Sequence, residues 1–190
     1  MRREEALAIL HEYTKTEGLR RHAYAVEAAM RACAARFGED PEVWGVVGLL
    51  HDFDYEQFPR YPDHPVKGSE ILAARGLDEA SRRAILGHVP AMNVPRETGM
   101  ARALFACDEL CGFVMACAAV RPNKLADLEA SSVRKKLKDK AFARAVSRDD
   151  IQQGIAELQV EFADHVQMVI DALRPIAAAL GLSSDVKGEP

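Results

Sequence analysis

The sequence predicts an all-α protein. Apolar residues recur every three or four positions along almost the whole chain, and no stretch alternates apolar and polar residues for long. Residues that start and stop helices fall at the edges of the apolar segments. The chain has 190 residues, 48% of them hydrophobic and 28% charged, which is enough for one substantial core and little for a second. We therefore predict a single helical bundle.

The first half of the chain divides into five predicted helices. Pro41 suits the first turn of the third helix, which is apolar on nearly every side and therefore central. A loop rich in Pro, Tyr and Asp follows at 53–63, where Asp63 is a candidate cap, and Gly76 lies just past the end of the next helix. The five helices are expected at about 3–13, 17–37, 41–52, 64–75 and 78–88.

The second half begins with a long and very apolar helix. A strongly basic stretch follows, which we expect to form one or two helices, and two further helices complete the bundle. A single domain is predicted over 1–182, with a metal-binding core at about 17–120 and a C-terminal extension at 124–182, before a flexible tail at 183–190. The elements of this half are expected at about 98–119, 124–148, 149–159 and 161–181.

Composition excludes several classes of protein. The formal net charge of −4 argues against general binding to nucleic acid or to an anionic membrane. The N-terminus MRREEALAILHEY does not have the pattern of a secretory signal, and no apolar run approaches the roughly 18–20 residues of a membrane span. We expect a cytoplasmic monomer or homodimer. Four cysteines without CxxC spacing are interpreted as reduced core thiols, namely Cys33, Cys107, Cys111 and Cys117.

Imidazoles and carboxylates interrupt the apolar faces of several predicted helices. Singly, each has an ordinary explanation, because a buried histidine is often only hydrogen-bonded and a buried aspartate often caps a helix. Together they occur without a basic side chain on the same faces, and an unpaired buried carboxylate is costly. This pattern favours a divalent metal site with nitrogen and oxygen ligands. The candidates are His22, His51, Asp52, His64, His88 and Asp108.

The order and spacing of these residues resemble a known family. His22, the adjacent pair His51 and Asp52, and Asp108 are similar to the H…HD…D signature of the HD superfamily of metal-dependent phosphohydrolases. The segment DHPVKGSEIL contains the HPxxG turn of the dinuclear members, with His64, and ILGHV supplies His88. The whole chain resembles a group of small, HDIG-related bacterial and archaeal HD-domain hydrolases, although HDFDYE differs from the HDIG spelling.

The resemblance implies a dinuclear centre. One metal would be held by His22, His51, Asp52 and Asp108, and a second by Asp52 as a bridge together with His64 and His88. Iron or manganese is expected, and cobalt, nickel, zinc or magnesium are alternatives. The implied reaction is hydrolysis of a phosphomonoester or phosphodiester by a metal-bound hydroxide, with a small, nucleotide-like phosphorylated substrate.

Several further residues are candidates for substrate binding or proton transfer. Lys67 lies one helical turn after His64 and is the first candidate for a substrate phosphate, with a solvated surface lysine as the alternative. Arg96 follows His88 in the VPRE loop and is a further candidate contact for substrate phosphate. Any of Asp54, Tyr55 and Glu56, just after the ligand pair, is a possible general acid or a turn former, and Glu56 is the candidate for proton transfer. The basic stretch, with Arg134 and Lys135, either lines the pocket mouth or is a solvated helix face.

Two other classes of function remain open at this point. Six-ligand HD sites also resemble the di-iron oxygenases of the superfamily, which would consume oxygen. The third class is a non-catalytic HD module that binds a ligand or takes part in signalling. A complete set of ligands argues against that class.

Overall fold

The computed structural model describes residues 1–184 and confirms the all-α class, because no strand occurs in that range. Nine α-helices lie within these residues, together with two short 3₁₀ helices, η1 (Pro90–Met92) and η2 (Arg174–Ile176). The α-helices are α1 (Arg3–Tyr13), α2 (Glu17–Phe37), α3 (Pro41–Leu50), α4 (Asp63–Ala74), α5 (Glu79–His88), α6 (Gly99–Ala119), α7 (Ala130–Leu137), α8 (Arg148–Leu158) and α9 (Phe162–Leu173).

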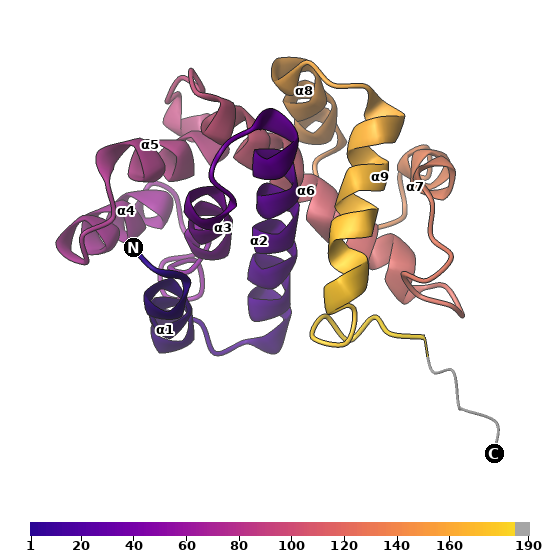
Figure 1. Ribbon diagram of the computed structural model, residues 1–190, viewed down its shortest axis with the longest axis horizontal. Coiled ribbons are helices and arrows are strands. Elements are labelled where there is room, and N and C mark those ends of the chain that lie inside the picture. Colours follow the sequence, from indigo (N-terminus) through magenta and orange to yellow (C-terminus); the bar gives the residue numbers. More distant parts are fainter. Residues whose placement is uncertain (185–190) are drawn as a thin grey trace.

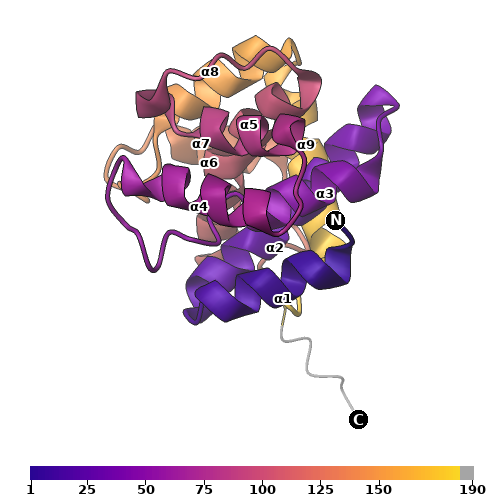
Figure 2. The same ribbon diagram turned by 90° about the vertical axis from the view of Figure 1, so that its left-hand side faces the viewer.

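The bundle is built around α2 and α6. Figure 1 shows α2 and α9 side by side, with α1, α3, α4 and α5 on one side of them and α7 on the other. The turned view in Figure 2 brings α1, α4 and α5 to the front. Helix α2 packs on α3, α6 and α9, and α6 also packs on α5 and α8. No helix in the described part of the chain is long and apolar enough to cross a membrane.

Side-chain caps fix the beginning of four helices. Asp40 accepts a hydrogen bond from the backbone N–H of Glu42 at the start of α3, and Asp78 accepts one from Ser81 at the start of α5. Thr98 and Ser147 cap α6 and α8 in the same way. Each cap satisfies a helix N–H that has no intrahelical acceptor, so the predicted helix starts agree closely with the observed ones.

A close approach of two helices depends on Gly48 in α3. A Cβ at this position would lie 2.8 Å from the backbone oxygen of Val26 in α2, closer than real contacts allow. The glycine therefore lets α3 lie against α2. His51, three residues further on, is consequently carried into the interior beside α2, where it is fully buried.

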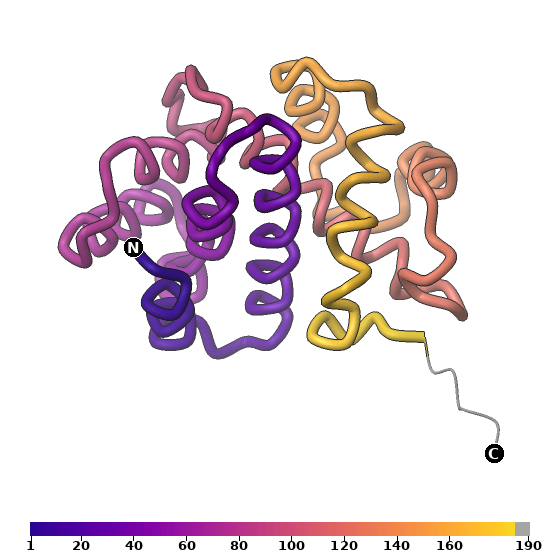
Figure 3. Tube along the Cα trace, in the orientation of Figure 1, coloured from indigo at the N-terminus to yellow at the C-terminus, as the bar shows by residue number. Residues whose placement is uncertain are grey.

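The last predicted helix is too long. The chain was expected to stay helical over 161–181, but α9 ends at Leu173 and is followed by η2 and turns, which Figure 3 shows as a change of direction after α9. Pro175 is the physical reason, because it lacks the N–H that would continue the α-helical hydrogen bonds, and the chain goes on as the 3₁₀ turn η2. The guanidinium of Arg174 donates to the carbonyls of Leu125 and Leu128 instead.

The basic stretch is helical only over α7, and the chain from Lys140 to Ser147 forms turns. The guanidinium of Arg148 holds these turns, since it donates to the carbonyl oxygens of Phe142, Ala143 and Val146. These three carbonyl oxygens have a hydrogen-bond donor in Arg148, so the segment can be non-helical without leaving them unpaired. Of the tail predicted at 183–190, residues 185–190 lie outside the described part of the chain.

Candidate metal centre

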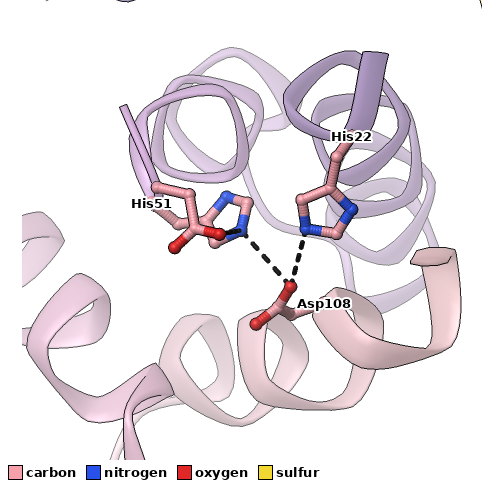
Figure 4. A group of neighbouring side chains, drawn as sticks. His22, His51 and Asp108 are labelled. Carbon is pink, nitrogen blue, oxygen red and sulfur yellow. Dashed lines mark hydrogen bonds and ion pairs between the residues drawn. The ribbon is translucent and has the colours of Figure 1, made fainter. Parts of the chain in front are cut away.

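Two histidines from different helices point at one carboxylate. His22 of α2 places its Nε2 2.9 Å from Oδ1 of Asp108 on α6, and His51, directly after α3, places its Nε2 3.3 Å from the same oxygen. Figure 4 shows both imidazoles aimed at Asp108. Oδ2 of Asp52 lies 3.4 Å from Nε2 of His51. Residues 86 positions apart in the chain thus share one small volume.

Asp52 connects this group to a second one. Its other oxygen, Oδ1, lies 3.3 Å from Nε2 of His64 and 3.1 Å from Nε2 of His88. The ligand atoms of His22, His51, Asp52 and Asp108 lie within 4.8 Å of one another, and so do those of Asp52, His64 and His88. Asp52 therefore offers one oxygen to each group, which is the geometry of a bridging carboxylate.

Three of the four histidines are held by a hydrogen bond at Nδ1. His51 Nδ1 lies 2.8 Å from the carbonyl oxygen of Gly48, and His88 Nδ1 lies 2.5 Å from that of Ile85. His64 Nδ1 lies 2.9 Å from Oδ1 of Asp54. Because these acceptors require a proton on Nδ1, each imidazole in its neutral form directs the lone pair of Nε2 into the cluster, as a metal ligand must.

The donor set fits a divalent metal. The buried Nε2 of His51 has no hydrogen-bond partner, although it lies between Asp52 and Asp108. Within residues 1–184, no lysine or arginine forms an ion pair with either carboxylate. An unpartnered buried nitrogen facing two carboxylates without a basic partner is an unsatisfied arrangement that a cation satisfies.

Electrostatics within the cluster agree with a strong demand for positive charge. Burial opposes protonation of His51 and His64, yet the neighbouring carboxylates outweigh it and raise the pKa of both imidazoles, that of His64 to about 9. Burial likewise opposes ionisation of Asp108, but His51 and His22 hold its pKa well below the usual range. Cations that bind here replace protons on the imidazoles.

One side of the cluster is open. The side chains of Asp52, His22 and Asp108 are 23%, 20% and 17% exposed, whereas His51 is fully enclosed. Tyr55 is 41% exposed and lies edge-on to His64, with 5.3 Å between the ring centroids. The two carboxylates and His22 are therefore the groups that an approaching molecule meets.

Three of the other predicted site residues, Lys67, Glu56 and Arg96, contact protein groups outside the ligand cluster. The Nζ of Lys67 lies 3.2 Å from Asp63 and over the ring of Phe58. Glu56 is exposed, and its carboxylate accepts the backbone N–H groups of Lys15 and Thr16, which ties the loop after α3 to the start of α2. Arg96 forms two hydrogen bonds with Glu157 of α8 and one with the carbonyl of Gly87.

Arg134 and Lys135 lie on α7, which packs on α9 and α6. The guanidinium of Arg134 lies over the ring of Phe162, and Lys135 lines a small surface pocket beside Arg121. The two histidines outside the predicted ligand set are packing residues: His11 is hydrogen-bonded to Tyr24, and buried His165 donates from Nε2 to the carbonyl of Ala106.

Two groups at the cluster were not singled out by the sequence pattern. Asp54 was a possible general acid or turn former in the sequence, and the structure shows it buried and hydrogen-bonded to His64. Glu109, next to Asp108, is half-buried and accepts the N–H of Ser147; burial and then the charge of Asp108 raise its pKa to about 7. The sequence did contain a signal for Asp54, because this carboxylate follows the predicted ligands His51 and Asp52 by only two residues.

Comparison with known families identifies the family of this chain. The model of the HD domain family matches residues 19–173, most of the chain, so the protein belongs to the HD domain family. Members of this family are commonly metal-dependent phosphohydrolases. The matched range extends past the expected core at 17–120 and ends with α9. Neither the curated proteins nor the solved structures give a significant match.

Proposed function

We propose that this protein is a metal-dependent phosphohydrolase that acts on a small, nucleotide-like phosphate ester. The observation that carries the proposal is the position of Asp52, whose two oxygens face two separate groups of ligands. The proposed ligands of one ion are His22, His51, Asp52 and Asp108, and those of a second are Asp52, His64 and His88. Iron or manganese suits this mixture of imidazole and carboxylate.

Two divalent ions so placed supply a nucleophile from water at neutral pH and stabilise negative charge on a phosphoryl group. The protein's part is to fix the geometry around them. Asp52 sets the spacing between the two groups, and Nδ1 hydrogen bonds hold three imidazoles in orientation. The exposed side of Asp52, His22 and Asp108 is where a phosphate ester reaches the site.

Two residues near this opening are proposed substrate contacts. Lys67 lies three residues after His64 on α4, and its partner Asp63 is exposed, so substrate phosphate can replace that ion pair. Tyr55 offers an exposed aromatic ring beside His64, which favours a substrate that carries a flat base. We expect nucleotides to be hydrolysed in preference to phosphate esters without an aromatic group, and Tyr55→Ala to reduce that preference.

The test is hydrolysis of a panel of nucleotides, phosphodiesters and simple phosphomonoesters, with added Mn²⁺ or Fe²⁺, followed as free phosphate from the monoesters and as the monoester product from the diesters. The variant is Asp52→Ala, and the matched control is Asp171→Ala, which removes an exposed carboxylate paired with Arg174. Turnover that requires metal and Asp52 but not Asp171 supports the proposal. If the protein binds metal and hydrolyses neither the monoesters nor the diesters, the proposal is contradicted. Oxygen uptake by the ferrous protein then distinguishes an oxygenase from a binding module.

A further inference from the structure

Asp54 is the buried carboxylate nearest to the ligands that is not itself a proposed ligand. Its side chain is 1% exposed, and both oxygens are used. Oδ1 lies 2.9 Å from Nδ1 of His64, and Oδ2 accepts the backbone N–H of Gly68 at 3.1 Å. Because the Asp54 carboxylate is shielded from solvent, its role must come from its two contacts with α4.

Both donors come from the beginning of α4. His64 has an extended backbone conformation, with φ −82° and ψ 131°, because it precedes a proline, and the regular helix begins after it. Gly68 lies one turn further on, where the positive end of the helix dipole favours a negative charge. Asp54 therefore binds one ligand side chain and the helix that carries it.

Gly68 makes this contact possible. A Cβ at this position would lie 2.5 Å from Cγ of Asp54, closer than real contacts allow. Only glycine lets the backbone approach the carboxylate so closely. His64 and Gly68, four residues apart on α4, thus both donate to the carboxylate of Asp54.

We propose that Asp54 is a positioning residue for the second metal, the one that Asp52, His64 and His88 would bind. This inference rests on the proposed metal centre. The carboxylate accepts the proton of His64 Nδ1, so the neutral imidazole keeps its lone pair on Nε2, which faces Asp52. It acts through His64 and has no role in the first group of ligands.

Asp54→Asn keeps the shape of the side chain but cannot accept both hydrogen bonds. The carboxylate offers an acceptor to each of two N–H donors, whereas an amide has one acceptor oxygen and one NH₂ donor. If the amide oxygen faces His64, its NH₂ meets the N–H of Gly68. If it faces Gly68, its NH₂ favours the tautomer of His64 that carries the proton on Nε2, and that tautomer cannot bind a metal there.

The test is a calorimetric titration of metal-free protein with Mn²⁺. We expect two equivalents to bind wild type, and the second to bind Asp54→Asn about 10–100-fold more weakly while the first is unchanged. This is the usual effect of removing the hydrogen-bond partner of a metal ligand. Ser147→Ala is the matched control, because it removes a helix cap on α8 without touching a ligand, and it is expected to bind both equivalents as wild type does.

Gly68→Ala provides a second variant that keeps the charge of Asp54 and displaces it by sterics, and it carries the test if Asp54→Asn does not fold. The inference is overturned if both equivalents bind to these variants as to wild type, if both are weakened equally, or if wild type binds fewer than two. Phosphate release is not part of this readout. Failure of the proposed activity with two bound ions is therefore distinguishable from failure of the role of Asp54.

Discussion

The contacts of Arg96 indicate a role in stability, whereas the sequence predicted a contact with substrate, and a quantitative prediction separates the two roles. The residue was expected to contact substrate phosphate, but its guanidinium forms a fork with Glu157, with Nε to Oε2 at 2.6 Å and Nη2 to Oε1 at 2.7 Å. It also donates to the carbonyl of Gly87 and lies 3.7 Å from the centroid of Phe105. The perturbation is Arg96→Met, which keeps the aliphatic bulk and removes the charge.

The size of the effect follows from burial. Removing one partner of a fully buried ion pair costs about 3–5 kcal/mol, because the other charge is left without a partner. Here the side chain of Arg96 is 11% exposed but that of Glu157 is 29% exposed, so water partly replaces the lost contact. We therefore expect Arg96→Met to lower the free energy of unfolding by about 2 kcal/mol, which corresponds to a Tm roughly 4–8 °C lower in a chain of this size.

The assay is urea unfolding at pH 7 of wild type, Arg96→Met, Glu157→Gln and the double variant. A coupling energy of about 1–2 kcal/mol is expected, because the two side chains contact each other directly. The ion pair with Arg96 lowers the pKa of Glu157 below its usual value of 4.5. The contribution of the pair is therefore complete above pH 4.5 and is lost as the pH falls through the lowered pKa, so the stability difference between wild type and Arg96→Met should shrink below pH 4.5.

One result would refute this reasoning. If Arg96→Met unfolds like wild type, within about 0.5 kcal/mol, but no longer releases phosphate with metal bound, then Arg96 exchanges Glu157 for substrate. The role predicted from the sequence would then be the correct one.

Three further predictions concern other parts of the molecule. Glu56→Ala is expected to lower Tm and to keep the turnover per bound metal, because Glu56 accepts backbone N–H groups and does not contact substrate. Lost turnover at an unchanged Tm would instead support Glu56 as the proton-transfer residue. Gly154→Ala is expected to destabilise by about 1–3 kcal/mol in urea unfolding, because its Cβ would lie 2.7 Å from Cα of Ala106, and an unchanged midpoint would contradict the close packing of α6 and α8. Burial, and to a smaller extent Arg36, lowers the pKa of His165 below 6.5, so the unfolded chain binds this proton more readily than the folded protein does. The stability of wild type relative to His165→Gln should therefore fall by up to about 1.4 kcal/mol per pH unit below pH 6.5. Parallel pH profiles of the two proteins would contradict the lowered pKa.

The sequence by itself determined the helices and the candidate ligands. Apolar periodicity and caps are local signals, so the starts of α1, α2, α3 and α8 could be predicted within a residue. The six candidate ligands were recognisable because imidazoles and carboxylates interrupt apolar faces, and the structure brings all six together.

Only the tertiary structure decided which polar side chains are partners. Arg96 and Glu157 are 61 positions apart, and whether that arginine meets a carboxylate or solvent depends on how α8 packs. From the sequence Asp54 was a possible general acid or turn former, whereas the fold buries it against His64 and Gly68. The physical reason is that helix formation depends on neighbours in the chain, whereas burial and pairing of charges depend on neighbours in space.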